Sequence, residues 1–388
     1  MTSQPYNARV AEQQHLLQVY SQFDFEPVRA EGVHITCRDG TRLLDLYGGH
    51  AVASLGYAHP DVLQALEQQA KQLFFQSNAV ALEVRAAAAA RLAAVSPANL
   101  NQVFLVNSGA EANENALRIA FKQTGRNKVL AVEHGFHGRT AAAGAVTWGA
   151  AEKWYAFPRT PFDVAFIPRD DADAATKMID GDTAAVIIEL VQGIAGAYHL
   201  HPTFVAAIAD ACHKTGALLI VDEVQTGVGR TSEYFATDLY GLQPDLLTTA
   251  KALGSGFPCG AVMLTDELAA GIDKGSLGTT FGGGPLACTM IQTVLDVIKR
   301  DDLLANVRKL SARLQTECLT GPVSKVSGKG FLLGLHCPGG ARHVRDALLE
   351  LGILVGMSDD PAVLRLLPPL VLNDEHVDEL ISALAGIS

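Results

Sequence analysis

Short, continuously apolar runs alternate with segments of helical spacing through the middle of this chain, and this alternation limits the fold more than any other feature. A strand that is apolar along its whole length is buried on both faces, which is typical of a parallel sheet covered by helices. The sequence therefore predicts an α/β fold with a large, mostly parallel sheet between layers of helices. The apolar runs lie at 103–107, 128–133, 184–190, 217–222, 245–249 and 261–265, and helical spacing follows Asp61, begins near Glu111, and covers 204–213 and 285–300.

The two ends of the chain carry a second and smaller set of predicted elements. Near the N-terminus, strand-like runs at 33–37 and 42–47 flank Asp39-Gly40, a pair typical of hairpin turns, and a helix-prone arm is expected before them. The C-terminal part contains strand-like runs at 331–337, 353–357 and 364–367, with helices over 341–351 and from Glu375. We therefore expect three regions: an N-terminal arm with part of a small domain (1–50), a large domain (51–300) and the rest of the small domain (301–388).

Charge and cysteine spacing argue against several functional classes. The formal net charge is −11 and the 388 residues contain no dense run of Lys or Arg, which argues against a nucleic-acid-binding protein. The six cysteines form no C-x-x-C pair and no spacing typical of metal ligands, so no metal site is predicted. Residues 1–14 are polar, and no apolar stretch approaches the roughly 20 residues of a membrane helix. We therefore expect a cytoplasmic protein with reduced thiols and no membrane partner.

Small residues follow the first apolar run, at the point where a helix is expected to begin. Asn107-Ser108-Gly109-Ala110 would bring backbone N–H groups close to an anion, and the positive end of the helix dipole favours a phosphate there. The segment matches neither the G-x-x-x-x-G-K-[ST] loop nor G-x-G-x-x-G, so nucleotide and dinucleotide binding lose their main support. A helix cap at Asn107 or Ser108 accounts for the same residues equally well.

Three further strand ends carry side chains that could bind or react. Asp222 ends one apolar run, and an acid there is costly unless it meets a positive partner or caps a helix. Lys251 follows the next run beside small residues, which makes it a candidate nucleophilic amine, although most lysines are solvated surface charges. The turn at 134–140 combines an aromatic ring, imidazoles and a guanidinium, all of which could also be simple turn residues. Each feature alone is weak evidence for a site.

Taken together, these strand ends offer the set of groups that pyridoxal phosphate requires. Its aldehyde takes a lysine, its ring nitrogen needs a carboxylate, and its ring and phosphate need an aromatic plate and an anion cradle. Because ligands of open α/β sheets bind at the carboxyl ends of the strands, we expect the four groups to lie close together. The sequence therefore predicts pyridoxal 5'-phosphate as the cofactor.

Seven stretches spread over essentially the whole chain also read like the motifs of one known family. They are 55–60 (L-G-Y-A-H-P), 104–114 (F-L-V-N-S-G-A-E-A-N-E), 136–140 (F-H-G-R-T), 222–231 (D-E-V-Q-T-G-V-G-R-T), 251–258 (K-A-L-G-S-G-F-P), 278–287 (G-T-T-F-G-G-G-P-L-A) and 365–372 (R-L-L-P-P-L-V-L). With these motifs the sequence resembles the class III, fold type I pyridoxal-phosphate-dependent aminotransferases, and most closely the acetylornithine aminotransferase branch.

The resemblance implies a role toward the cofactor for several residues. Lys251 is expected to bind the cofactor covalently through its amine, and Asp222 to pair with the ring nitrogen. Phe136 and Val224 are expected to stack on opposite faces of the ring, and Gln225 to reach the ring hydroxyl. The phosphate is expected to lie against Ser108, Gly109 and Ala110.

The resemblance also implies residues that bind substrate and a second subunit. Arg139 and Arg365 are expected to take substrate carboxylates, with Thr279 near the substrate. Thr280 is expected to reach the phosphate bound by the neighbouring subunit, which implies a homodimer with shared active sites.

The implied reaction is the transfer of the terminal amine of an N-acylated ornithine to 2-oxoglutarate in arginine metabolism, which leaves a semialdehyde. Lys251 acts as base and then as acid at the reacting carbon atoms. One alternative is another ω-amino acid transaminase, for ornithine, 4-aminobutyrate or a diamine. An aminomutase or racemase on the same fold is a further alternative, since a fold does not fix a reaction. A binding or regulatory protein without activity would need neither Lys251 nor Asp222.

Three departures from the family pattern leave the acyl group of the substrate open. Relatives usually read E-P-x-Q-G-E-x-G where this chain has 189–196, so Ile194 replaces an acid that can pair with the arginine equivalent to Arg365. We expect Ile194 to leave Arg365 permanently available for a carboxylate, unless another acid masks it. His50 stands where the acetylornithine branch is usually apolar and is either a ligand contact or a loop residue without a role. Gly284 replaces a common Asn.

Overall fold

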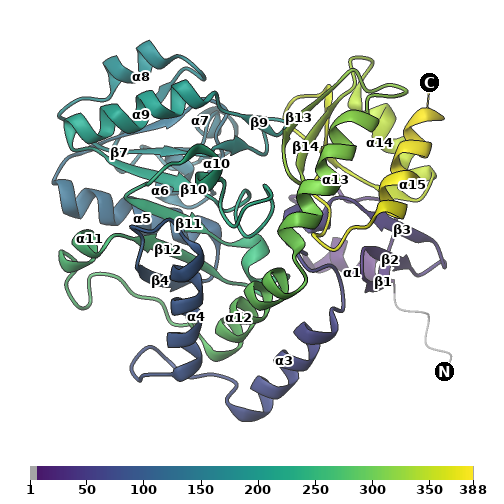
Figure 1. Cartoon of the computed structure of the whole chain (residues 1–388), viewed down its shortest axis with the longest axis horizontal. Coiled ribbons are helices and arrows are strands. Elements are labelled where there is room, and N and C mark those ends of the chain that lie inside the picture. Colours follow the sequence, from purple (N-terminus) through teal and green to yellow (C-terminus); the bar gives the residue numbers. More distant parts are fainter. Residues whose placement is uncertain (1–6, 388) are drawn as a thin grey trace.

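The computed structural model describes residues 7–387, which form a large part around a seven-stranded sheet and a smaller part around two four-stranded sheets (Figure 1). The predicted α/β fold with a large, mostly parallel sheet is confirmed. The strand order is β4-β12-β11-β10-β7-β5-β6, and only β12 runs antiparallel to its neighbours. The strands are β4 (Gln102–Val106), β5 (Lys128–Val132), β6 (Asp163–Ile167), β7 (Thr183–Ile188), β10 (Leu218–Asp222), β11 (Leu246–Thr249) and β12 (Gly260–Leu264).

Helices cover both faces of this sheet, and the central strand β7 shows why its sequence is continuously apolar. All six residues of β7 are buried. Ala185 and Ile187 pack into the core on one face, whereas Val186 and Ile188 pack into the core on the other. The helices of the large part are α4 (Glu83–Val95), α5 (Gly109–Thr124), α6 (Ala141–Ala145), α7 (Ala150–Lys153), α8 (Ala172–Met178), α9 (Pro202–Thr215), α10 (Ala236–Tyr240), α11 (Asp266–Ala270) and α12 (Pro285–Arg300).

The smaller part is built from segments near both ends of the chain, residues 27–45 and the residues after α12, which lie together on the right of Figure 1. One sheet has the order β1-β2-β3-β15 and the other β13-β14-β17-β16. The predicted hairpin is confirmed, because β2 and β3 pair antiparallel around the turn at Asp39-Gly40. We propose that these sheets form the small domain expected over 1–50 and 301–388. Its strands are β1 (Pro27–Glu31), β2 (His34–Cys37), β3 (Arg42–Asp45), β13 (Lys325–Lys329), β14 (Leu332–His336), β15 (Ile353–Leu354), β16 (Gly356–Met357) and β17 (Val363–Leu366), and its helices are α13 (Leu303–Glu317), α14 (Ala341–Glu350) and α15 (Asp374–Ala385).

The prediction of one strand over 353–357 is wrong. Residues of β15 pair with β3 in parallel, and after Val355 the chain continues as β16, which pairs antiparallel with β17 in the other sheet. Residues 353–356 are buried and Met357 is partly buried, so their apolar sequence reads as a single strand. The segment therefore connects the two sheets of the smaller part.

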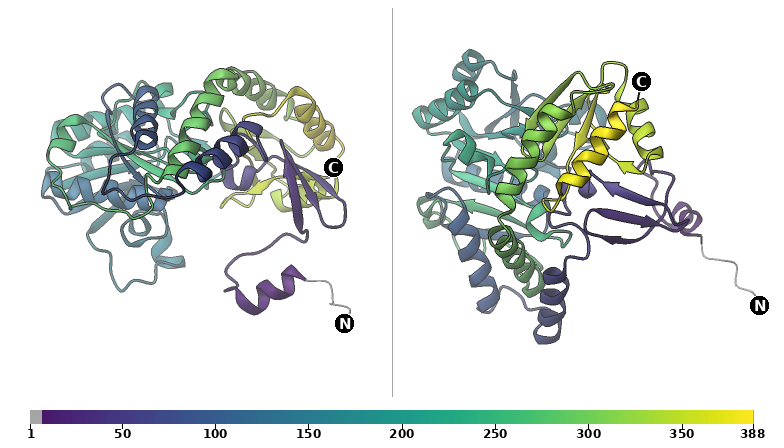
Figure 2. Two further views of the ribbon diagram at one scale, coloured as in Figure 1. Left: turned by 90° about the horizontal axis from the view of Figure 1, so that it is seen from below. Right: turned by 45° about the vertical axis from the view of Figure 1, so that its right-hand side comes forward.

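In the N-terminal arm and in one long helix no described residue is fully buried, although the long helix packs against α12. In the arm, helix α1 (Ala8–His15) buries none of its residues and stands apart from the body of the molecule (Figure 2), and residues 1–6 of the predicted arm lie outside the described residues. Helix α3 (Pro60–Gln72) also buries none of its residues, and Leu63 is 53% exposed. Short elements complete the fold, namely α2 (Gly48–Ala51), β8 (Val191–Gln192) and β9 (Tyr198–His199).

Three further findings concern the residues that the structure describes. In residues 7–387 we find no helix that is both long and apolar enough to span a bilayer. The six cysteines are buried and unpaired. In the same residues, no cluster of three His, Cys, Asp or Glu side chains could hold a metal ion.

Candidate active site

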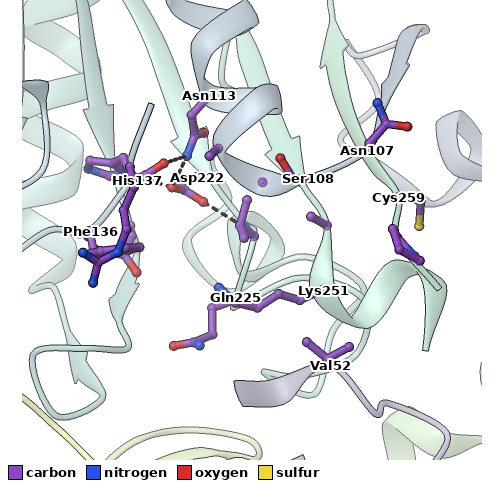
Figure 3. A pocket seen from close by; sticks show the side chains of 18 of the residues that line it. Val52, Asn107, Ser108, Asn113, Phe136, His137, Asp222, Gln225, Lys251 and Cys259 are labelled. Atoms are coloured by element: carbon purple, nitrogen blue, oxygen red, sulfur yellow. Dashed lines mark hydrogen bonds and ion pairs between the residues drawn. The ribbon is translucent and has the colours of Figure 1, made fainter. Parts of the chain in front are cut away.

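A pocket of about 510 Å³ lies at the carboxyl ends of the strands of the large sheet (Figure 3). Its walls come from the segments after β4, β5, β7, β10 and β11, as expected for a ligand site in an open α/β sheet. The structure thus brings together most of the residues that the sequence singled out. Those that line the pocket are Ser108, Gly109, Ala110, Phe136, Arg139, Asp222, Val224, Gln225 and Lys251.

Asp222 is the last residue of β10, and its buried carboxylate is held by three donors. Its Oδ2 accepts from Asn113 Nδ2 at 2.7 Å and lies 2.8 Å from His137 Nδ1, while its Oδ1 accepts from the backbone N–H of Val224 at 2.9 Å. Because a carboxylate only accepts, His137 carries its proton on Nδ1 here. Oδ1 keeps room for a second donor from the pocket. The carboxylate of Asp222, expected to need a partner, is therefore stabilised by these three hydrogen bonds.

The donors to Asp222 are themselves fixed. Asn113 lies on α5 and also donates to the backbone carbonyl of His137 at 2.7 Å, and its Oδ1 accepts from the hydroxyl of Thr248 at 2.6 Å. His137 is 2% exposed, and its Nε2 has no partner in the described residues. This network holds the Asp222 carboxylate in one orientation.

Glu189 places a second buried carboxyl group beside Asp222. It follows β7, accepts from the backbone N–H of Phe136 at 2.8 Å and lies 3.4 Å from that of Gly193. Burial, and then the charge of Asp222, raise the pKa of Glu189 to about 7. Through its contacts with Phe136 and Gly193, Glu189 links the turn that carries Phe136 to the loop that carries Ile194.

Lys251 begins the short 3₁₀ helix η1 (Lys251–Gly254) directly after β11. Its φ is +39°, a left-handed conformation that is uncommon for a lysine and typical of functional sites. The amine makes no hydrogen bond or ion pair with any other of residues 7–387, and burial lowers its pKa, although Asp222 and Glu189 act in the opposite direction. An amine of this kind is more often neutral, and therefore nucleophilic, than one on the surface.

The start of α5 serves both as a capped helix end and as an anion cradle. The Ser108 hydroxyl accepts from the backbone N–H of Glu111 at 3.1 Å, so the capping alternative is correct for this side chain. Gly109 and Ala110 are the first residues of the helix, where N–H groups have no intrahelical acceptor. A Cβ at Gly109 would lie 2.5 Å from Val224 Cγ1, so only glycine allows the backbone this close to Val224.

Two more predicted residues are held in place by their neighbours. The Gln225 amide fills the space beside Gly193, where a Cβ would lie 1.6 Å from Gln225 Oε1. Arg139 is exposed, and its guanidinium lies 4.6 Å from the ring centre of Trp154 and 5.8 Å from that of Phe136. Cation–π contacts of this kind keep an exposed arginine at the pocket wall.

Arg365 lies on β17 outside the pocket lining, and it is buried. Its Nε donates to the carbonyl of Met357 at 2.7 Å, and its Nη2 donates to the hydroxyl of Tyr47 at 3.0 Å. Its Nη1 is buried and has no partner among the described residues. No carboxylate of residues 7–387 forms an ion pair with Arg365, which argues against masking by another acid of the same chain.

Thr279 and Thr280 also lie outside the pocket lining, on the loop before α12. The Thr279 hydroxyl accepts from Asn107 Nδ2 at 3.1 Å and from the backbone N–H of Gly282 at 3.2 Å, and its carbonyl accepts from Asn78. Asn107 lines the pocket, so Thr279 reaches its edge only through this amide. Thr280 is exposed. Their expected roles stay predictions.

Sequence reasoning missed Asn113, His137, Glu189 and Tyr47 as site residues. Two of them had a usable signal: Glu189 ends an apolar run as Asp222 does, and His137 belongs to the turn at 134–140. Asn113 and Tyr47 had none, because each is a single polar residue whose partners come from distant segments.

Comparison with known proteins identifies the family of this chain. The sequence profile described as aminotransferase class-III matches residues 18–387. An acetylornithine aminotransferase from Archaeoglobus fulgidus is 39% identical over 375 residues, which cover 95% of this chain and 97% of that protein. The chain belongs to the class-III aminotransferases.

Solved structures agree with this family. A structure of the ornithine aminotransferase from Toxoplasma gondii, with PLP in partial occupancy at its active site, matches this class-III aminotransferase with a TM-score of 0.91 and 28% identity, covering 98% of this chain and 94% of that one. An acetylornithine aminotransferase from Elizabethkingia anophelis matches with a TM-score of 0.86 and 29% identity, covering 97% of each chain. The protein is therefore an aminotransferase that depends on pyridoxal phosphate.

The pocket of this class-III aminotransferase fits that cofactor on structural grounds alone. Lys251 presents an amine without a partner among residues 7–387, and Asp222 Oδ1 keeps a place for one more donor. Free N–H groups at the start of α5 suit a phosphate, and Gly109 leaves no side chain in its way. Val224 and Phe136 supply apolar surfaces in the same pocket.

Proposed function

We propose that this aminotransferase moves the terminal amine of an N-acylated ornithine to 2-oxoglutarate, in arginine metabolism. The observation that carries the proposal is two guanidinium groups: Arg139 lines the pocket, and Arg365, outside the lining, has a buried Nη1 without a partner among residues 7–387. Both substrates carry carboxylates that such groups bind in charge-assisted hydrogen bonds. The Archaeoglobus fulgidus relative, an acetylornithine aminotransferase, supports the choice of an acylated ornithine.

We assign the cofactor contacts to the residues that line the pocket. Lys251 would hold the cofactor covalently, Asp222 Oδ1 would accept a hydrogen bond from the protonated ring nitrogen, and Gln225 would reach the ring hydroxyl. Gly109 and Ala110 hold the phosphate through their backbone N–H groups. Phe136 and Val224 cover the two faces of the ring.

The reaction follows from what these residues do. When bound, the cofactor supplies an aldehyde that takes up the amine and a ring that accepts the electron pair of the broken C–H bond. The amine of Lys251, released when the substrate amine takes its place, would remove the proton from the amine-bearing carbon of the substrate and, as an acid, deliver it to the carbon that carried the aldehyde. Asp222 keeps the ring nitrogen protonated, since its carboxylate is fixed by Asn113, His137 and Val224.

We further propose a homodimer in which Thr280 reaches the phosphate of the partner's site. The proposal is supported by the exposure of Thr280 outside its own pocket and by a cluster of exposed apolar side chains around it. Phe74 and Phe281 are each 67% exposed, and helix α3 buries no residue in the single chain. A patch of this kind is typical of a subunit interface. A cytoplasmic location and the absence of nucleic-acid or membrane partners stay predictions.

An amino-donor panel tests the substrate. The enzyme loaded with pyridoxal phosphate is mixed in single half-reactions with N-acetylornithine, ornithine, 4-aminobutyrate and putrescine, and the loss of cofactor absorbance is followed. We expect N-acetylornithine to react at least about tenfold faster than any other donor, because only it combines a carboxylate and an acylated α-amine with a single free terminal amine. Faster reaction with ornithine would favour the second candidate, an ornithine aminotransferase, which the structural likeness to the Toxoplasma gondii enzyme supports. Turnover without any 2-oxo acid would instead indicate an isomerase.

A further inference from the structure

A chain of hydrogen bonds runs from Arg365 through Tyr47 to His50. The Nη2 group of Arg365 donates to the Tyr47 hydroxyl at 3.0 Å, and that hydroxyl lies 2.7 Å from Nδ1 of His50. A guanidinium can only donate, so the Tyr47 oxygen accepts from Arg365 and its own proton is left for Nδ1. His50 is therefore the acceptor at the end of the chain, and its proton lies on Nε2.

Tyr47 is fixed firmly enough to orient its partners. Its backbone N–H donates to Asp45 Oδ1 at 2.8 Å, and the N–H of Gly48 donates to the same oxygen at 2.9 Å. Its ring occupies the space beside Gly356, where a Cβ would lie 1.9 Å from Tyr47 Cε2. The hydroxyl consequently has one position, set by β3 on one side and β16 on the other.

In this arrangement one nitrogen of Arg365, Nη1, still lacks a hydrogen-bond acceptor among residues 7–387. With Nε on the Met357 carbonyl and Nη2 on Tyr47, the buried Nη1 has no partner among residues 7–387. An unpaired N–H group in a buried site is costly, so an added acceptor there is bound favourably. The chain of hydrogen bonds adjoins the pocket, because Nε2 of the pocket residue Gln225 lies 3.5 Å from the backbone carbonyl of His50. Besides burial, the positive charge of Arg365 also lowers the pKa of Lys251.

We propose that Tyr47 and His50 are positioning residues that hold Arg365 ready for a substrate carboxylate and set the preference of the site for dicarboxylic acceptors. The inference rests on the proposed function in assigning substrate carboxylates to Arg365. Ile194 offers no acid at the position where relatives carry one, and the neutral Tyr47 and His50 orient the guanidinium without cancelling its charge. The site therefore stays open in both half-reactions.

Matched variants separate positioning from general damage. Tyr47→Phe keeps the ring beside Gly356 and removes only the hydroxyl. His50 has a φ of +65°, a conformation that both Gly and Asn adopt readily, so His50→Gly removes the acceptor and His50→Asn keeps one without backbone strain. Tyr57→Phe is the control, because the Tyr57 hydroxyl also belongs to the Asp45 cluster, donating to Asp45 Oδ2 at 2.5 Å.

The measurement is the dissociation constant of glutarate, an unreactive five-carbon dicarboxylate, determined by calorimetry on the enzyme loaded with pyridoxal phosphate. We expect Arg365→Gln to weaken binding by at least about 30-fold, Tyr47→Phe by about tenfold and His50→Gly by about threefold. His50→Asn and Tyr57→Phe should stay within about twofold of the wild type. For Tyr47→Phe the KM for 2-oxoglutarate should rise while kcat stays within about twofold.

Several outcomes overturn the proposal. If Tyr47→Phe or Arg365→Gln left the dissociation constant of glutarate unchanged, dicarboxylate binding would not depend on a guanidinium held by Tyr47. Equal losses in His50→Asn and His50→Gly would show that the acceptor on residue 50 has no part. Failure of the proposed function looks different, since a donor panel that excludes acylated ornithine leaves the glutarate measurements as they are.

Discussion

The two ends of the active site differ in how completely their buried charges are paired. On the cofactor side, the Asp222 carboxylate is held by an amide, an imidazole and a backbone N–H group. On the substrate side, the buried Arg365 guanidinium has two neutral acceptors and one N–H group without a partner among residues 7–387. The Asp222 carboxylate already has its hydrogen-bond partners before a ligand binds. The Arg365 guanidinium, in contrast, gains a missing hydrogen-bond acceptor from its ligand. The cofactor side is thus built for permanent occupancy and the substrate side for exchange.

The largest expected effect is on the cofactor side, at Lys251. We expect Lys251→Ala to lower transamination by at least about 10³-fold, because both the covalent link and the proton transfer are lost. Borohydride reduction of the wild type followed by peptide mapping should place the pyridoxyl adduct on Lys251. An adduct on any other lysine would contradict the assignment of this end of the pocket.

Subunit mixing tests whether the cofactor side is complete within one chain. Lys251→Ala and Thr280→Ala subunits, each of low activity, should regain about a quarter of wild-type activity after exchange, since half of the dimers are hybrids with one intact site. The gain is measured against unmixed controls, with exchange verified by tagged subunits. If verified hybrids show no gain, Thr280 does not serve the partner's site.

Asp222→Asn tests how much the negative charge of the hydrogen-bonded Asp222 carboxylate contributes to kcat. We expect kcat to fall by roughly 10²-fold, because the neutral amide cannot keep the ring nitrogen protonated and turns a donor toward Asn113 or His137. Asp163→Asn, at an exposed position of the same sheet, is the matched control and should leave kcat unchanged. Similar rates for both variants would mean that the charge of Asp222 is dispensable.

Ile194→Glu is expected to give the guanidinium of Arg365, on the substrate side, a carboxylate partner. Ile194 lines the pocket, and an acid there is expected to pair with the free N–H of Arg365. Acceptor binding should weaken by about tenfold in the half-reaction with 2-oxoglutarate and less in the donor half-reaction, while Ile194→Gln should change both by less than about threefold. Equal losses in both halves, or none, would refute the idea that Ile194 keeps Arg365 open.

The sequence predicted the cofactor side better than the substrate side for a physical reason. Residues such as Asp222 and Lys251 directly follow apolar strands, and the geometry of an open α/β sheet alone brings strand ends together. The contact between Tyr47 and Arg365 joins positions 318 residues apart, one just after β3 and one in β17, and no local pattern encodes it. Hydropathy also failed to show the antiparallel direction of β12, because its five residues are buried whichever way the strand runs.

The change of sheet at residues 353–357 has a consequence for how the enzyme acquires its selectivity during synthesis. Strands β1, β2 and β3 leave the ribosome early, yet β15, the partner that completes their sheet, is made near the end. All residues assigned to the cofactor within one chain have been made by Lys251, whereas Arg365 is oriented only when Tyr47 from the first part meets Met357 from the last. A nascent chain can therefore hold every cofactor ligand of its own pocket before it can select a substrate, and selectivity is the last property to be assembled.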